Sequence, residues 1–279
     1  MTQKGKIAYD RSEEIGEFRF AMNMNLCECE GGRSHTVLEV SCRLKGESTW
    51  ARHTICSQRN KSRAILWNCL VAGTLSYRRA KDAEFRSEPW SAKFGNKCLR
   101  HIGHYCGNRR YHRTPRNPNV EFEIVKSIYV DLADPSHQLI EDPSDAVKFK
   151  IEDQELWLPK MRLSAHSPFF TKLFISDFIE GEYELDVKLD EFLHFVGILH
   201  CFDMPIDQSS IEYLLKLSDM WQCDLVHQRC VEYLLRTTDL GVMEKRCIAE
   251  RFKLPEVLCL ITTYKESESE ESNQEIPLC

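Results

Sequence analysis

The sequence predicts an α+β protein in two parts, a β-sandwich followed by a mixed domain of short strands and helices. Strong helical periodicity is absent between residues 15 and 132, where several segments alternate apolar and polar side chains. Apolar side chains at helical spacing recur only after residue 163. Period-two alternation is typical of half-buried strands, whereas spacing at i, i+3 and i+4 is typical of helices.

The charge of the chain divides near the same place. Residues 1–120 hold 22 basic and 11 acidic side chains, whereas residues 121–279 hold 15 and 32. A break of this kind indicates two domains with different partners. The last stretch, 265–279, is acidic, polar and without periodicity, so it is predicted to be a disordered tail.

The N-terminal half is predicted to be a β-sandwich. Alternation is clear over 38–44 and 120–132, and an apolar run of strand length, AILWNCLVAG, covers 64–73. Several short strands at such spacing are typical of a sandwich. We expect this β domain to occupy 15–134, with residues 1–14 as an N-terminal arm.

The C-terminal half predicts strands and helices in a mixed order. Strands are expected at 145–151, 155–158 and 183–189, because apolar and polar residues alternate there. In LSAHSPFFTKLF, Ser167 followed by Pro168 predicts a helix start, since the hydroxyl can cap free N–H groups and proline needs no donor there. Further helices are expected at 190–199, 211–215 and 225–235, and a helical pair at 239–264.

The run LSAHSPFF at 163–170 resembles the core helical motif of BTB/POZ domains, and the order of hairpin, helix, strand and helices around it is similar. The resemblance is greatest to nematode proteins, in which LDEF and LLKLSDMW have close counterparts. It implies a BTB/POZ domain at 140–238 with a helical extension at 239–264. Two features depart from the family: Trp157 replaces a usual His, and LHCFDMPI at 199–206 replaces the usual turn after the fourth strand.

In nematode proteins of this type a MATH domain often precedes the BTB/POZ domain. MATH is a β-sandwich of similar length. Trp50, Trp90 and the closing strand NVEFEIV resemble features of that domain. The resemblance implies that the N-terminal domain holds a peptide of another protein in a shallow groove. An unassigned β domain is the alternative.

In many families a BTB/POZ domain binds the cullin-3 scaffold of a ubiquitin ligase through a hydrophobic residue, any residue, then an acid. Phe178, Ile179 and Glu180 match this motif and its position. The resemblance therefore implies a substrate-recruiting adaptor of a cullin-3 ubiquitin ligase, for an unknown substrate protein. On the residues alone, Phe178 can instead close the domain's own core, with Glu180 a solvated charge.

The resemblance also implies a homodimer. The first strand and the helix at 161–164 would contribute to a two-fold interface. The candidate interface residues are Val147, Phe149, Met161, Leu163 and Ser164. A monomer or a hetero-dimer is the alternative, because Trp157 lies near this region.

Metal binding and catalysis find little support in the sequence. Cys98, His101, His104 and Cys106 follow a C-x2-H-x2-H-x-C pattern, and His53 with Cys56 adds an H-x2-C pair. Thiolates and imidazoles are ligands of Zn²⁺, but this tight spacing favours core thiols and exposed histidines. Because phosphate-loop, nucleophile-elbow and HExxH motifs are missing, we expect no enzyme, no metal and no cofactor.

A basic loop suggests the alternative function. Arg109, Arg110, Arg113 and Arg116, beside Tyr111, could contact a polyanion or an acidic partner. The alternative is thus a BTB-mediated scaffold or transcription-associated protein that does not bind cullin-3 and contacts nucleic acid through its basic N-terminal half. The adaptor is favoured over nucleic-acid binding, because the sequence lacks a separate DNA-reading module.

The sequence also predicts the compartment. No apolar run approaches the ~18 residues that a membrane-spanning helix needs, and the N-terminus lacks the apolar core of a signal peptide. We therefore expect an intracellular protein, cytoplasmic or nuclear, without a membrane partner. The 13 cysteines are expected to be reduced thiols there.

Overall fold

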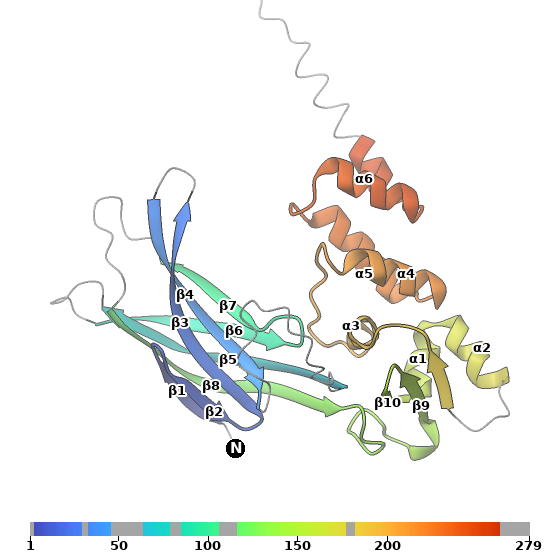
Figure 1. Ribbon diagram of the computed structural model, residues 1–279, viewed down its shortest axis with the longest axis horizontal. Helices are drawn as coiled ribbons and strands as arrows, with labels where there is room; N and C mark the ends of the chain where they lie inside the picture. The colour runs from blue at the N-terminus through green and yellow to red at the C-terminus, as the bar shows by residue number, and fades with distance from the viewer. Residues whose placement is uncertain are drawn as a thin grey trace, which may run out of the picture. The chain divides into compact units, whose positions relative to one another are not determined.

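The computed structural model describes residues 3–29, 33–45, 64–78, 85–105, 116–176 and 182–262 (Figure 1). The chain divides into two compact units, one comprising Met1–Leu132 with Cys201–Pro205 and the other Ala133–His200 with Ile206–Cys279. The first unit is built of strands and the second mixes strands with helices, so the predicted α+β class is confirmed.

The first unit contains two four-stranded antiparallel sheets. One has the order β1-β8-β5-β6, with β1 (Lys4–Ala8), β8 (Arg116–Asp131), β5 (Ile65–Arg78) and β6 (Phe85–Gly95). The other has the order β2-β3-β4-β7, with β2 (Ser12–Ile15), β3 (Phe18–Cys29), β4 (Arg33–Leu44) and β7 (Arg100–Tyr105). Inward side chains of both sheets share one buried core, which makes the unit a β-sandwich.

Aromatic rings join the two sheets of the sandwich. Phe20 of β3 and Phe122 of β8 have ring centroids 4.7 Å apart, and Phe20 also contacts Phe94 of β6 edge-on. Phe18 lies 5.5 Å from Trp67 of β5. Offset and edge-on arrangements of this kind are the favourable ones for aromatic pairs. The core thus depends on alternate residues of strands that are far apart in the sequence.

The predicted N-terminal arm is part of the sandwich, so residues 1–14 were wrongly placed outside it. β1 pairs with β8 and β2 pairs with β3. Ile7 is only 1% exposed in the core. Each of these strands is at most five residues long and buries one side chain, so the alternation is too short to be recognised.

Gly73 in the middle of β5 is required by the close approach of β8. A Cβ atom at this position would lie 1.9 Å from the carbonyl oxygen of Glu121. β8 also contains a register shift opposite Leu70 and Val71, where Val125 is left over as a β-bulge. The bulge leaves Val125 54% exposed.

The second unit has a three-stranded sheet of order β10-β9-β11, in which β11 is parallel to β9. Its strands are β9 (Ala146–Ile151), β10 (Gln154–Pro159) and β11 (Glu182–Leu185), preceded by the 3-10 turn η1 (Pro143–Asp145). The helices are α1 (Lys160–His166), α2 (Pro168–Ser176), α3 (Leu189–Leu199), α4 (Ile211–Met220), α5 (Asp224–Arg236) and α6 (Val242–Arg251), and residues 255–262 are also helical. None of the described helices is long and apolar enough to cross a membrane.

Phe149 lies at the centre of the second core. Its ring contacts Phe170 of α2 edge-on and Phe192 of α3, with centroids 6.0 and 5.9 Å away. On the opposite face of the sheet, Lys148 bridges Glu155 and Glu182. One face of the sheet is therefore apolar and covered by helices, and the other is polar, as the alternation predicted.

We expect Gly73→Ala to reduce the free energy of unfolding of the sandwich by about 2–4 kcal/mol, because the added methyl group forces β5 and β8 apart. Urea unfolding followed by tryptophan fluorescence measures this change. Thr74→Ala, at the exposed next position of the same strand, is the control and should cost less than about 1 kcal/mol. Equal stability of the two variants would contradict the close approach of the strands.

Candidate protein-interaction surfaces

The start of α2 is held by one buried serine. The Oγ atom of Ser167 accepts a hydrogen bond from the N–H of Phe170 (3.2 Å) and donates one to the carbonyl oxygen of Trp221, at the end of α4. The predicted cap is thus confirmed, and it also links α2 to α4. Ile175 at the other end of α2 is 75% exposed. α2 therefore presents an apolar side chain directly before the predicted cullin-3 motif.

The predicted cullin-3 motif, Phe178 to Glu180, lies outside the described residues. The elements on either side of it are described: α2 ends at Ser176 and β11 begins at Glu182. The motif therefore follows a helix that is fixed to the core through Ser167 and Phe170. Its surface position stays a prediction.

The five predicted dimer residues differ in exposure. Val147, Phe149 and Leu163 are fully buried within the second unit itself, so they expose no surface to a partner. Alternation marks a buried face but does not tell whether the domain's own helices or a second chain cover it. Met161 is 72% exposed and Ser164 is half-buried on α1. Of the five predicted residues, only Met161 and Ser164 can therefore contribute to a dimer surface on α1.

A group of basic side chains surrounds the end of α3. The Nδ1 atom of His137 accepts the N–H of Leu139 (3.2 Å), so its Nε2–H donates to the carbonyl oxygen of Trp157 (2.7 Å). Arg162 of α1 donates to the carbonyl oxygen of Leu199 (3.1 Å). These contacts join α1, the hairpin and α3 through backbone carbonyl groups.

His200 follows α3 and lies beside these cations. Burial, together with the neighbouring charge of Arg162, lowers its pKa to about 4. Its buried Nε2 atom has no hydrogen-bond partner in the described part of the chain. The ring is therefore neutral in the folded protein at neutral pH.

The sandwich has a groove on the outer face of the sheet β1-β8-β5-β6. Its cavity volume is about 620 Å³. The residues that line it come from four strands: Lys4, Gly5, Lys6, Glu13, Ala72, Gly73, Glu121, Phe122 and Glu123. We name it the Gly73 groove after the glycine among its lining residues.

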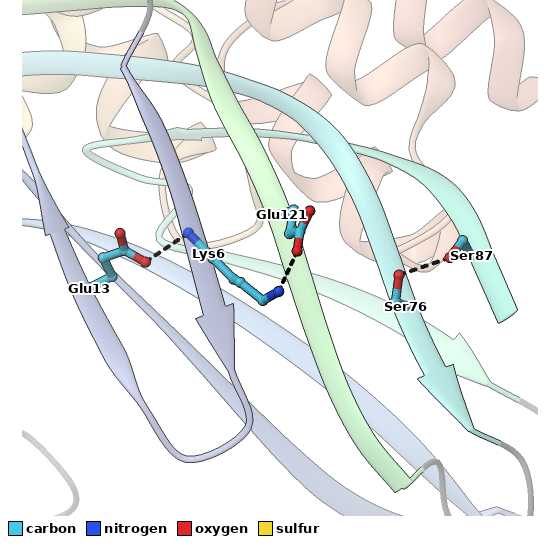
Figure 2. A network of polar contacts seen from close by, with 5 residues as sticks. All are labelled: Lys6, Glu13, Ser76, Ser87 and Glu121. Atoms are coloured by element: carbon cyan, nitrogen blue, oxygen red, sulfur yellow. Dashed lines mark hydrogen bonds and ion pairs between the residues drawn. The ribbon is translucent and has the colours of Figure 1, made fainter. Parts of the chain in front are cut away.

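Polar contacts hold one wall of the Gly73 groove (Figure 2). The backbone N–H of Lys6 donates to Oε2 of Glu13 (2.7 Å), and the Lys6 ammonium forms an ion pair with Glu121 of β8. Farther along the same face, the hydroxyl groups of Ser76 and Ser87 lie 2.9 Å apart. The pairing of Lys6 with Glu13 occupies a backbone donor of an edge strand, which hinders strand addition there.

Sequence reasoning missed the groove. Glu121 and Glu123 were recognised as the polar positions of a strand, but Lys4 and Lys6 were assigned to an arm. The signal was the pair of motifs Lys-x-Lys at 4–6 and Glu-x-Glu at 121–123, which lie opposite each other in the register of β1 and β8. Only the strand pairing shows that they face each other.

The predicted zinc ligands are separated or lie outside the described residues. The Cys98 thiol donates weakly to the carbonyl oxygen of Lys93, and burial raises its pKa. The His101 ring contacts Trp90 edge-on, and burial lowers its pKa. Position 104 also lies in β7, but its side chain is outside the described part. His53, Cys56 and Cys106 are not described, and no group of three or more ligating side chains could hold a metal elsewhere in the described part.

The predicted basic patch, at residues 109–116, lies outside the described side chains. Arg109, Arg110 and Arg113 lie outside the described residues, and Arg116 begins β8, without a described side chain. The described groove has a different charge balance, with three carboxylates against two ammonium groups. The excess of basic residues in this half therefore does not extend to the groove.

Part of the second unit is similar to a known domain family. The family model for the BTB/POZ domain matches residues 140–238. BTB and MATH domain-containing protein 38 of Caenorhabditis elegans is 32% identical over 37% of this chain and 28% of its own length. BTB and MATH domain-containing protein 36 of the same organism is 28% identical over 37% of this chain and 34% of its own. Human Kelch repeat and BTB domain-containing protein 4 is 26% identical over 40% of this chain and 22% of its own. The matches thus span about a fifth to a third of the length of these relatives.

We expect Ser167→Ala to lower the free energy of unfolding of the second unit by about 2–3 kcal/mol, because it removes a helix cap and leaves the Trp221 carbonyl group without its donor. Thermal unfolding followed by circular dichroism tests this. Thr238→Ala, at an exposed position after α5, is the control. A variant as stable as the control would contradict the bridging role of Ser167.

The low pKa of His200 predicts that stability falls in acid. Between pH 6.5 and about 4 the unfolded chain binds a proton at His200 that the folded chain does not, so this contribution is complete above pH 6.5 and is lost as the pH falls toward 4. We expect His200→Gln to remove on the order of 2 kcal/mol of the difference in unfolding free energy between pH 7 and pH 4.5. Urea unfolding at both values measures it, with His227→Gln as the matched control. An unchanged pH dependence in His200→Gln would refute this account.

Proposed function

Because residues 140–238 match the BTB/POZ domain family, we propose that this chain is a protein-interaction adaptor that recruits a target protein to a cullin-3 ubiquitin ligase. The match to the BTB/POZ family carries this proposal. A separate β-sandwich before the domain supports it, because an adaptor needs one surface for the ligase and another for the target. The names of the relatives pair BTB with MATH or Kelch repeats, which supports a second binding domain on the same chain.

The ligase surface in this proposal contains Phe178, Ile179 and Glu180. They follow α2, whose exposed Ile175 extends the apolar surface. An aromatic ring that fills a pocket beside a carboxylate that fixes register is a common arrangement at interface hot spots. The chain would supply binding alone, with no catalytic residue, metal or cofactor, and would act in the cytoplasm or nucleus.

The proposal includes a homodimer through α1, with Met161 and Ser164 at the interface. Two copies of the sandwich would then bind a target together, which raises the effective concentration of each weak site. A scaffold that dimerises without binding cullin-3 is the second candidate. It needs only the surface of α1, on which Met161 is 72% exposed.

We expect the double variant Phe178→Ala, Glu180→Lys to raise the Kd for purified cullin-3 by at least about ten-fold, because it removes the apolar anchor and reverses the charge. A pull-down with the full-length chain and a titration measure the binding. Asp153→Lys, at the exposed turn between β9 and β10, is the control for changed charge. Mass in solution and thermal unfolding should be the same for all three proteins.

Three results would redirect the proposal. If the double variant unfolds, Phe178 belongs to the domain core and the assigned ligase surface is wrong. If the double variant is folded and binds as well as the parent chain, the motif is an ordinary loop. If the parent chain is a folded dimer that does not bind cullin-3, the scaffold replaces the adaptor.

A further inference from the structure

We propose that the Gly73 groove binds an extended, basic segment of a partner protein across the face of the sheet β1-β8-β5-β6. This inference rests on the proposed role of the sandwich in capturing a target and names the class of segment. It was not expected from the sequence, where the basic N-terminal half suggested an acidic partner.

The space in the groove suits an extended chain. Its volume of about 620 Å³ is within the ~300–1,000 Å³ that is usual for ligand sites. Ala72 and Gly73 form a floor with almost no side chain, and the approach of the Glu121 carbonyl group excludes any larger residue at position 73. A backbone with small side chains can therefore lie directly on the strands.

The charges of the groove favour a basic segment. Lys6 is already paired with Glu121, and Glu13 uses one oxygen to accept the Lys6 N–H. Glu123 lies opposite Lys4 in the register, yet no ion pair joins them in the described part of the chain. Two carboxylates, Glu13 and Glu123, thus retain acceptor capacity against one uncommitted ammonium group, that of Lys4.

Contact area must supply most of the affinity, because exposed ion pairs contribute only ~0–1 kcal/mol each. Val125, which the β-bulge leaves 54% exposed, lies two residues beyond Glu123 on β8 and offers an apolar contact beside the groove. The occupied Lys6 N–H and the two lysines of β1 hinder pairing along the edge of the sheet. The segment therefore lies across the face of the sheet.

The test uses the full-length chain and two fluorescein-labelled pools of degenerate decapeptides, with either lysine or glutamate fixed at the centre. Fluorescence anisotropy at 50 and 200 mM salt, chosen as roughly a two-fold change in Debye length, measures binding. We expect the lysine pool to bind at least about ten-fold more tightly than the glutamate pool, and to lose affinity with salt. Ala72→Arg should raise the Kd of the lysine pool about ten-fold by filling the groove.

Two further variants keep this test decisive. Ser91→Arg adds the same charge at the exposed neighbour of Ala72 in β6, outside the groove, and should change the Kd less than about two-fold. Glu123→Gln keeps the shape of the groove and should reduce the preference for lysine. Thermal unfolding checks that each variant is folded.

The inference is overturned if neither pool binds, if both pools bind equally, or if Ala72→Arg and Ser91→Arg have the same effect. Because this assay contains no cullin-3, failure of the groove leaves the cullin-3 proposal standing. Conversely, a chain that does not bind cullin-3 can still prefer the lysine pool, which would assign the groove to the scaffold instead.

Discussion

The buried hydroxyl group of Ser167 is the contact on which the second unit depends. It caps α2 through the Phe170 N–H and donates to the Trp221 carbonyl group at the end of α4. The Trp221 ring in turn contacts Phe170 and Phe195. The Oγ atom of Ser167 therefore helps to fix both the direction of α2 and the position of the buried Trp221 ring. A buried hydroxyl group without these partners would be strongly unfavourable, so the packing and the hydrogen bonds specify the same arrangement.

The sandwich depends on a comparable agreement between backbone and core. Gly73 allows β5 and β8 to approach closely, and that approach holds Phe122 against Phe20 of the opposite sheet. The groove on the outer face lies over these same two strands, because residues 72–73 of β5 and 121–123 of β8 line it. Its shape therefore depends on how closely β5 and β8 pack.

The strands and helices with long periodic patterns were predictable from the sequence, because alternation over 38–44 or 145–151 directly reflects burial on one face. The pairing of β1 with β8 was not, because it joins residues more than a hundred positions apart and each short strand buries too little to show a pattern. For the predicted dimer residues, the sequence shows which side chains are apolar but does not show what covers them. Phe149 is covered by the domain's own helices, which follows only from tertiary packing. The groove was not predictable either, because its charged residues lie on short, distant strands. Only the register of β1 and β8 brings them together.

Charge acts on two length scales in this chain, and the two need not agree. The excess of 22 basic over 11 acidic residues in 1–120 attracts anionic partners over roughly the Debye length of 8–10 Å. Within the Gly73 groove, by contrast, the lining groups act at contact and their balance is acidic. Under the proposal above, an acidic protein that displays a short basic segment would satisfy both fields: the first would speed encounter and the second would hold the bound segment. In the proposed dimer two such weak contacts would act together, so that selectivity would come from each groove and affinity from their number.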